Sequence, residues 1–248
     1  MKMFSVKIGK REIGKNKPVF IIAEAGVNYN NKLSLAFKMI DIAARCGADA
    51  VKFQTFIVDN IHLKNSIKPR YQKLIKGKSY YNILKNLEPS FQQQIKIFNY
   101  CKKKNIIFLS TPYDEQSLNF LNKLGIPAFK ISSSDSTNHL FLESILKKRK
   151  PILLSTGLST EKEIKLTVKF IEKFKMLNKL VLLQTTSDYP TKNSDVNLKV
   201  IPEYIKKFKV LVGLSDHTLG IGAAVASIAL GATIIEKHIV LKKGDGSI

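Results

Sequence analysis

Short runs of apolar and β-branched residues recur along the chain, and most of them end in polar residues. Eight of these runs predict strands, over Val19–Gly26, Ala50–Phe56, Ile106–Pro112, Ala128–Ser133, Pro151–Gly157, Leu180–Ser187, Val210–His217 and Thr233–Leu241. The starts of the runs are continuously apolar and do not alternate with polar residues. This pattern is typical of strands buried on both faces, as in a parallel sheet.

Segments with a helical spacing of apolar residues fill the gaps between these runs. They predict seven helices, over Ser34–Cys46, Ser90–Lys104, Glu115–Leu124, Leu140–Lys148, Glu161–Phe174, Asn197–Phe208 and Gly222–Leu230. Pro202 must lie in or near the first turn of its helix, because proline cannot continue a hydrogen-bonded helix interior. Strands that alternate with helices in this way predict an α/β fold, a (β/α)8 or TIM barrel. A doubly wound open sheet is the alternative, since a sequence does not show strand order.

Two parts of the chain fall outside this regular alternation. The longest interval between strands holds an insertion, Ile57–Pro89, and residues 1–17 precede the first strand. We expect residues 1–17 to cap the floor of a barrel formed by residues 18–248. Only Lys242–Ile248 follow the eighth strand, too few residues for a stable helix. The sequence therefore predicts a barrel truncated after strand eight, with an apolar flank left uncovered.

Composition narrows the function classes. The 248 residues are 44% hydrophobic and 24% charged, as in ordinary folded globular proteins. The net charge is +22, but the excess is lysine scattered along the chain, and nucleic-acid sites favour concentrated stripes with arginine. No segment has the roughly 20 apolar residues of a membrane span, and the N-terminus has no signal-peptide core. We therefore expect a cytoplasmic protein with no nucleic-acid or membrane partner.

Polar side chains gather where the predicted strands end. In a (β/α)8 barrel the carboxyl ends of the strands surround the active site. They carry Glu24, Lys52, Gln54, Ser110, Thr111, Lys130, Ser132, Ser133, Ser155, Thr156, Gln184, Thr185, Ser187, Ser215, His217, Glu236 and His238. A single such residue can be a hydrogen-bonding group at a solvated rim. Agreement among eight strand ends indicates a functional site.

Two pairs within this set suggest specific chemistry. His217 and His238 end neighbouring strands, and imidazole is a common ligand of divalent metals, although a hydrogen-bonded pair without metal is the alternative. Lys52 and Lys130 lie in otherwise apolar strands. Together with the nearby hydroxyls, they predict a site for a phosphate or carboxylate. The alternative is that each lysine is paired with a neighbouring carboxylate.

Several motifs resemble the sialic acid (N-acetylneuraminate) synthase family, which includes the legionaminic and pseudaminic acid synthases. They are IIAEAGVNYN, GADAVKFQTF, FLSTPYDEQSLNFL, IPAFKISSSDSTN, KPILLSTGLST, TTSDYP and VGLSDHTLGIGAAVASIALGATIIEKH, in family order from Val19 onward. The resemblance implies condensation of phosphoenolpyruvate with an N-acetylhexosamine, such as N-acetylmannosamine. The products are a nine-carbon 2-keto sugar acid and phosphate. It also implies a C-terminal antifreeze-like domain, which we expect this chain to lack, and a homodimer in the full-length form.

The resemblance also implies roles for individual residues. His217 and His238 match ligands of a divalent metal, expected to be Mn²⁺, with Mg²⁺ or Co²⁺ possible. Matches to the phosphoenolpyruvate site are Lys52, Thr111, Lys130, Ser133, Ser155 and Ser215, with Ser187 where some members have Asn. Gln54 and Tyr189 match positions near the sugar. Glu24 matches an acidic residue that handles a proton or orients water, Glu236 lies beside the metal, and both join His238 as expected catalytic residues. Strand alternation favours Ser132 over Ser133 at the fourth strand.

Other functions stay open at this point. Tyr29 and Asn31 stand where the family usually has His and Gly, so the sugar acceptor is undetermined. Two strand lysines also permit an aldolase that forms a Schiff base. A barrel that binds a sugar phosphate without catalysis is a third possibility, and a basic surface that binds nucleic acid is a fourth.

Overall fold

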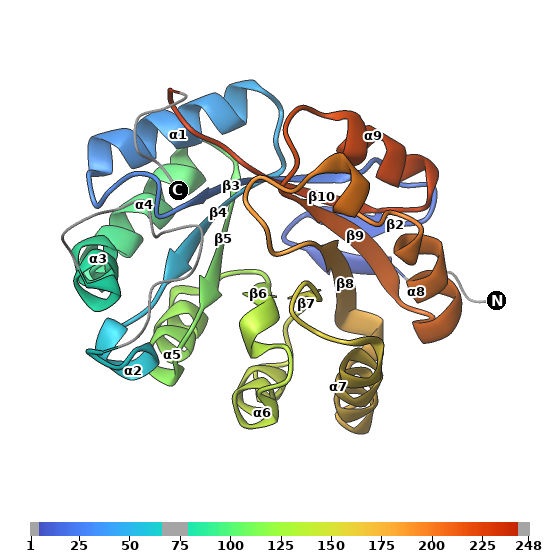
Figure 1. Ribbon diagram of the computed structural model, residues 1–248. Coiled ribbons are helices and arrows are strands. Elements are labelled where there is room, and N and C mark those ends of the chain that lie inside the picture. The colour runs from blue at the N-terminus through green and yellow to red at the C-terminus, as the bar shows by residue number, and fades with distance from the viewer. Residues whose placement is uncertain (1–4, 66–78, 243–248) are drawn as a thin grey trace.

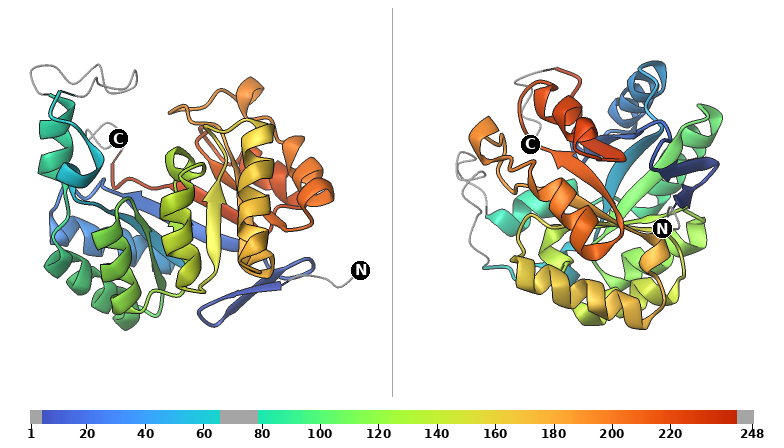
Figure 2. Two further views of the ribbon diagram at one scale, coloured as in Figure 1. Left: turned by 90° about the horizontal axis from the view of Figure 1, so that it is seen from below. Right: turned by 90° about the vertical axis from the view of Figure 1, so that its right-hand side faces the viewer.

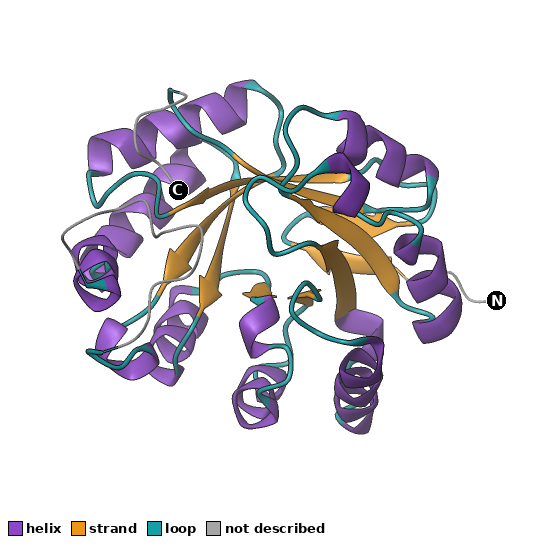
Figure 3. Cartoon of the chain, viewed as in Figure 1, coloured by secondary structure: helices purple, strands orange, loops and turns teal. Residues whose placement is uncertain are grey.

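The computed structural model describes residues 5–65 and 79–242. Eight parallel strands form a nearly closed barrel, with helices around the outside (Figures 1 and 3). The strand order is β5-β4-β3-β10-β9-β8-β7-β6. The last barrel strand along the chain, β10 (Ile234–His238), therefore pairs with the first barrel strand, β3 (Phe20–Gly26). The described residues form no backbone ladder between β5 and β6, which stand side by side at the seam of the barrel.

The strands and helices confirm the predicted alternation. The barrel strands are β3 (Phe20–Gly26), β4 (Ala50–Thr55), β5 (Ile107–Pro112), β6 (Phe129–Ile131), β7 (Ile152–Ser155), β8 (Leu180–Thr185), β9 (Leu211–Asp216) and β10 (Ile234–His238). The predicted helices are α1 (Leu33–Arg45), α4 (Phe91–Lys103), α5 (Glu115–Leu124), α6 (His139–Lys147), α7 (Glu161–Lys173), α8 (Val200–Phe208) and α9 (Gly222–Ala229). The fold is therefore the (β/α)8 barrel, and the open doubly wound sheet is excluded.

Local sequence accounts for where several helices start. Ser90 and Thr160 each cap a helix through a reciprocal capping box, with Gln93 and Glu163 respectively. Pro202 is the third residue of α8, where its missing N–H removes no helical hydrogen bond. Strand β6 is shorter than predicted. The Ser132 side chain caps a 3₁₀ turn, η2 (Ser133–Asp135), that ends the strand early.

The remaining elements lie at the two ends of the barrel. The hairpin of β1 (Ser5–Ile8) and β2 (Arg11–Gly14) lies beneath the strands (Figure 2). Its Val6, Ile8 and Ile13 form one buried cluster with inward residues of the strands, such as Leu153 and Ile234. The insertion after β4 contains α2 (Val58–Ile61) and α3 (Tyr80–Leu87).

The outer flank beside α1 and α9 exposes apolar side chains. Ile21 on β3 is 37% exposed, Ile42 on α1 is 36% exposed, and Val225 on α9 is 59% exposed. The expectation that Lys242–Ile248 form no eighth helix concerns residues 243–248, which lie outside the described residues.

The packing at Gly213 gives a test of the barrel interior. A Cβ at this position of β9 would lie 2.6 Å from the Ile234 carbonyl oxygen and 2.7 Å from Leu183 Cδ2. We expect Gly213→Ala to lower the free energy of unfolding by about 1–3 kcal/mol, as overpacked cores do. Urea denaturation measures this change. Gly222→Ala is the matched control, since a Cβ there meets nothing within 4 Å at the first turn of α9, and it should be neutral or stabilising. Equal stabilities of the two variants would contradict this description of the interior.

Candidate active site

A polar hollow of about 60 Å³ opens at the carboxyl ends of the barrel strands. It is lined by Glu24, Lys52, Gln54, Thr111, Tyr113, Lys130, Ser132, Ser133, Ser155, Thr185, Tyr189, Ser215, His217, Glu236 and His238. Strand register brings several of these residues together. Glu24 lies opposite Lys52 on one side and His238 on the other, and Glu236 lies opposite Ser215.

Two lysines and two glutamates form a buried charge cluster at the base of this hollow. Lys52 Nζ lies 2.7 Å from Glu24 Oε2 and 3.8 Å from Glu236 Oε2, and donates to Thr111 Oγ1 at 3.3 Å. Lys130 Nζ lies 3.7 Å from Glu236 Oε1 and donates to Ser155 Oγ at 2.7 Å. Each lysine thus has both a carboxylate and a hydroxyl, so the pairing with neighbouring carboxylates is present and the anion site stays a prediction.

Burial and neighbouring charges separate the pKa values of the two carboxyls. Burial raises the pKa of Glu24 to about 7, although Lys52 opposes the shift. Burial would also raise the pKa of Glu236. Lys130, Lys52 and the Ser215 hydroxyl, which donates to Oε1 at 2.9 Å, bring that pKa down to about 2. Glu236 is therefore a fixed anion, whereas Glu24 can gain or lose a proton near neutral pH.

The lysines differ in the same way. Burial lowers the pKa of Lys130 to about 8, and Glu236 offsets only part of that effect. Burial also acts on Lys52, but Glu236 and Glu24 outweigh it and raise its pKa. Lys52 is therefore a permanent cation at neutral pH, and Lys130 can lose its proton in mildly basic solution.

The two imidazoles lie at one side of the charge cluster with their rings 5.5 Å apart, centroid to centroid. His217 Nδ1 lies 2.7 Å from the Thr186 carbonyl oxygen. Because a carbonyl only accepts, Nδ1 carries the proton and Nε2 keeps its lone pair. Burial lowers the pKa of His217, and burial followed by the nearby His217 lowers the pKa of His238 to about 3. Both rings are neutral at pH 7, as metal ligation requires.

The donor set fits a divalent cation with few protein ligands. His238 Nδ1 is buried without a hydrogen-bond partner among the described residues. Glu236 Oε2 is also buried without a hydrogen bond among them, and Lys52 Nζ lies 3.8 Å from it. A buried imidazole nitrogen without a partner is costly unless something binds it. Within residues 5–65 and 79–242, no group of three or more His, Cys, Asp or Glu is placed to hold a metal. An ion at the two imidazoles would therefore keep open coordination positions.

The loop after β8 covers the histidines. The Tyr189 ring lies 4.1 Å from the His217 ring and meets the His238 ring edge-on at 5.7 Å. Thr191 N donates to the His217 carbonyl oxygen at 2.9 Å. Ser187 lies in the same loop, and its hydroxyl is 3.3 Å from the Ser133 hydroxyl.

The structure gathers the predicted site residues in one place. All residues to which a role was assigned line the hollow except Ser187, which reaches Ser133 at its edge. Three other strand-end residues do not line the hollow and bond elsewhere, namely Ser110 to Thr55, Thr156 to Leu183 and Gln184 to Val196. Ser132, which strand alternation favours, and Ser133, which the family motif favours, both line the hollow. The predicted roles omitted Tyr113 and Thr185. Thr185 has a sequence signal, since it is a strand-end hydroxyl. Tyr113 has no such signal, because it follows Pro112, the last residue of β5. Burial raises the pKa of Tyr113. Tyr29, by contrast, is fully buried and packs edge-on against Phe53, 5.6 Å between centroids.

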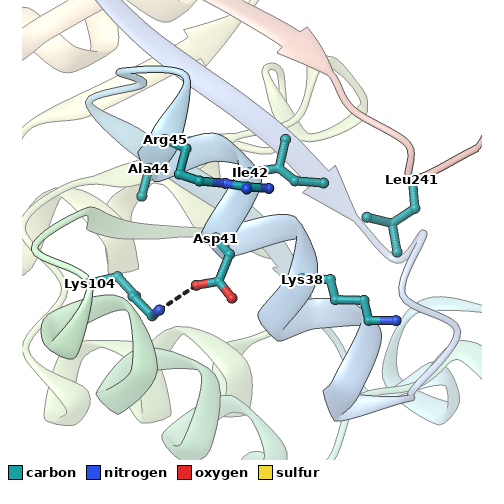
Figure 4. A pocket seen from close by; sticks show the side chains of 7 residues that line it. All are labelled: Lys38, Asp41, Ile42, Ala44, Arg45, Lys104 and Leu241. Atoms are coloured by element: carbon teal, nitrogen blue, oxygen red, sulfur yellow. Dashed lines mark ion pairs between the residues drawn. The ribbon is translucent and has the colours of Figure 1, made fainter.

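A larger hollow lies outside the barrel, along α1. It measures about 760 Å³ and is lined by Lys38, Asp41, Ile42, Ala44, Arg45, Lys104 and Leu241 (Figure 4). An ion pair within it, Lys104 with Asp41 at 2.7 Å, lies at the surface. The lining comes from α1, the end of α4 and the segment beyond β10, away from the polar strand ends. The smaller hollow at the barrel mouth is therefore the candidate site.

Comparisons with known proteins show which proteins this chain is similar to. The model of the NeuB family matches residues 39–247. The chain is 42% identical over 92% of its length to N,N'-diacetyllegionaminic acid synthase of Campylobacter jejuni, and covers 69% of that protein. It is 38% identical over 94% of its length to human N-acetylneuraminate-9-phosphate synthase, and covers 65% of it.

Solved structures of other proteins have a similar fold. The sialic acid synthetase of Leptospira borgpetersenii, solved with citrate, matches at a TM-score of 0.88 and 34% identity, over 99% of this chain and 82% of the other. The truncated 3-deoxy-D-arabino-heptulosonate 7-phosphate synthase of Thermotoga maritima, at 16% identity and a TM-score of 0.71, shares the fold.

Among the helices that the structure describes, none has the length and apolar character of a membrane-spanning segment.

The raised pKa of Glu24 predicts a characteristic pH dependence of stability. Its ordinary value is 4.5 and its folded value about 7, so between these pH values the folded state binds more protons than the unfolded state. The contribution of Glu24 to stability should therefore fall by about 3 kcal/mol as pH rises through this interval, while the lowered pKa values of His217 and His238 act in the opposite direction. Glu24→Gln should remove this contribution, so urea denaturation should show the wild type losing stability relative to the variant between pH 5 and pH 7.

Glu163→Gln is the control for this experiment. Glu163 is fully exposed and Thr160 lowers its pKa, so the stability of this variant should follow that of the wild type between pH 5 and pH 7. A Glu24→Gln protein that loses stability with pH in parallel with the wild type would show that this carboxyl does not bind the proton.

Proposed function

Because the chain belongs to the NeuB family, we propose that it is a sugar acid synthase acting at the barrel mouth. In this proposal it condenses phosphoenolpyruvate with an N-acetylhexosamine to form a nine-carbon 2-keto sugar acid and phosphate. The observation that carries the proposal is the pair of buried lysines, Lys52 and Lys130, each bonded to a strand-end hydroxyl beside two neutral imidazoles. The relatives' names support the class of product.

The lysines and hydroxyls would bind the anionic substrate. Phosphoenolpyruvate carries a phosphate and a carboxylate, and ammonium groups with hydroxyl donors match both. Lys52 with Thr111 and Lys130 with Ser155 offer two such donor pairs. Ser133, Ser187 and Ser215 add hydroxyls around the same hollow. Because protonated Glu24 leaves the two ammonium groups facing only the charge of Glu236, the cluster can take up further negative charge.

His217 and His238 would hold a divalent cation, which we propose is Mn²⁺, with Mg²⁺ or Co²⁺ as alternatives. When bound, such an ion polarises a carbonyl oxygen and so makes the sugar aldehyde more electrophilic. The hydrogen bond from His217 Nδ1 to the Thr186 carbonyl orients that ring and leaves Nε2 with its lone pair as the ligand atom. Tyr189 and Gln54 line the hollow and would contact the sugar.

Proton transfer falls to Glu24 in this proposal. The methylene carbon of phosphoenolpyruvate forms a bond to the aldehyde carbon, and the aldehyde oxygen takes up a proton. Water then adds to the former enol carbon with loss of a proton. The phosphate leaves with its bridging oxygen, and the new hydroxyl gives up its remaining proton to become the 2-keto group. A carboxyl with a pKa of about 7 can both give and accept a proton at neutral pH, as Glu24 can. Glu236 stays ionised and stabilises the positive charge that develops at the enol carbon.

One observation favours a second reaction type. The pKa of Lys130, lowered to about 8 by burial, is a property of lysines that form Schiff bases. An aldolase of that kind would bind its carbonyl substrate covalently. Borohydride added with substrate would then trap the lysine and raise the protein mass, whereas the synthase reaction forms no imine.

Phosphate release tests the proposed reaction directly. We expect inorganic phosphate to appear from phosphoenolpyruvate only when Mn²⁺ and one N-acetylhexosamine of a panel are both present. The relatives are named for legionaminic, pseudaminic and neuraminic acids, so the panel includes the acceptor of each branch. His217→Ala should abolish both Mn²⁺ binding and phosphate release. Release that is independent of any sugar, or absent with every acceptor, would refute the condensation.

Loss of either lysine should weaken phosphoenolpyruvate binding. Removing a charge-assisted hydrogen bond costs about 1.5–3 kcal/mol, so Lys52→Ala and Lys130→Ala should raise the Kd by roughly ten- to a hundredfold in calorimetric titrations. Lys150→Ala is the control, because this partly buried lysine lies over the Phe129 ring outside the hollow. Unchanged affinity in both site variants would place the anion elsewhere.

A further inference from the structure

An ion pair on the outer face of two barrel strands connects the segments that carry the histidines. Asp216 on β9 and Lys237 on β10 are register partners, and their side chains meet at 2.7 Å. Asp216 lies between Ser215 and His217 in the sequence, and Lys237 between Glu236 and His238. Because side chains alternate along a strand, the pair projects away from the hollow that its neighbours line.

The same ammonium group also holds the chain beyond His217. Lys237 Nζ donates to the Thr218 carbonyl oxygen at 2.7 Å, as well as to Asp216 Oδ2. Asp216 Oδ1 accepts from Thr218 N at 2.9 Å and from Thr218 Oγ1 at 2.8 Å. The residues on both sides of His217 are therefore fixed to a single lysine, which itself immediately precedes His238.

The His217 carbonyl and ring make hydrogen bonds of their own beside these contacts. With residues 216 and 218 fixed, the His217 carbonyl accepts from Thr191 N at 2.9 Å, and Nδ1 donates to the Thr186 carbonyl. The side chain of Asp216 is fully buried, whereas the side chain of Lys237 is 29% exposed. Loss of the lysine would leave the buried Asp216 carboxylate with its hydrogen bonds from Thr218 but without its cation, which favours rearrangement of the turn.

We propose that Lys237 is a positioning residue that sets the orientation of His217 relative to His238 through Asp216 and Thr218. The proposal depends on the proposed function only for its consequence, which is that the two imidazoles then face one metal ion. Outer partners of this kind typically change metal affinity by 10–100-fold, although they never touch the metal. The ammonium group of Lys237 bonds to Asp216 and Thr218, and neither of these residues lines the hollow.

The first experiment needs no metal. With four histidines in the chain, the ring nitrogens of each can be assigned by single substitutions in long-range ¹H–¹⁵N spectra. Wild-type His217 should show one tautomer, protonated at Nδ1. In Lys237→Met we expect a mixture of tautomers for His217, whereas Lys237→Arg, which keeps both donors, should restore the single form. A Lys237→Met spectrum identical to the wild type would overturn the proposal.

The second experiment titrates Mn²⁺ and follows its electron paramagnetic resonance. Lys237→Met should raise the Kd for Mn²⁺ by 10–100-fold, and Lys237→Arg by less than about threefold. Lys104→Met is the matched control. It breaks another Lys–Asp pair of 2.7 Å, between the end of α4 and α1, and should leave both the tautomer and the Kd unchanged.

The two readouts separate the failure of each idea. If the wild type binds no Mn²⁺, the metal part of the proposed function fails, and the His217 tautomer still decides the role of Lys237. If Lys237→Met only lowers the unfolding temperature, with tautomer and Kd as in the wild type, the ion pair is structural and the proposal is wrong.

Discussion

The site depends on the requirement that charges removed from water be compensated within the barrel. Glu24, Lys52, Lys130 and Glu236 are all buried, and an isolated ion in that position would cost several kcal/mol. They are tolerated because parallel register places carboxylates and ammonium groups within about 4 Å of one another. The compensation is unequal, since Glu236 lies between both cations while Glu24 has its close contact with Lys52. This inequality separates the two carboxyl pKa values and makes Glu24 the group that can exchange a proton.

The floor of the barrel supplies the rigidity that this arrangement needs. Below the polar layer, the inward positions carry apolar side chains, which the hairpin of β1 and β2 covers from beneath. Gly213 shows how tightly the lower layer is packed, since even one added carbon would approach two neighbouring strands below ordinary contact distance. A packed floor limits sliding of one strand past another, and a shift of one residue would exchange inward and outward side chains. The charge cluster therefore keeps its pairing because the apolar layer fixes the register.

Much of this could be predicted from sequence, for physical reasons that particular residues illustrate. Apolar runs marked all eight barrel strands because a strand covered on both faces excludes polar residues until its end. The strand-end residues Lys52, Lys130 and Glu236 were identified on this basis. Their partners could not be, because pairing depends on register and on side-chain reach, so the Glu24–Lys52 contact was only one of two open interpretations. Tyr113 escaped because it lies beyond a strand, where no periodicity applies. Asp216 and Lys237 could not be identified as a pair from the sequence. Strand alternation places both side chains on the outer face of the barrel, where a charge is not expected unless its partner on the next strand is known.

The two kinds of ion pair in this barrel differ in what they permit. The inner charges face a hollow and have hydroxyl neighbours, so in the proposed function protonation of Glu24 would let Lys52 bind an anionic substrate without leaving a buried carboxylate charge unpaired. The outer pair has no such opening. Asp216 is enclosed, and Lys237 divides its bonds between a carboxylate and a backbone carbonyl. Exchange at the outer pair would leave a buried carboxylate unpaired, which makes that contact far more resistant to rearrangement. If both proposals hold, the barrel would join an inner set of charges suited to binding an anion to an outer pair that keeps the neighbouring imidazoles in place.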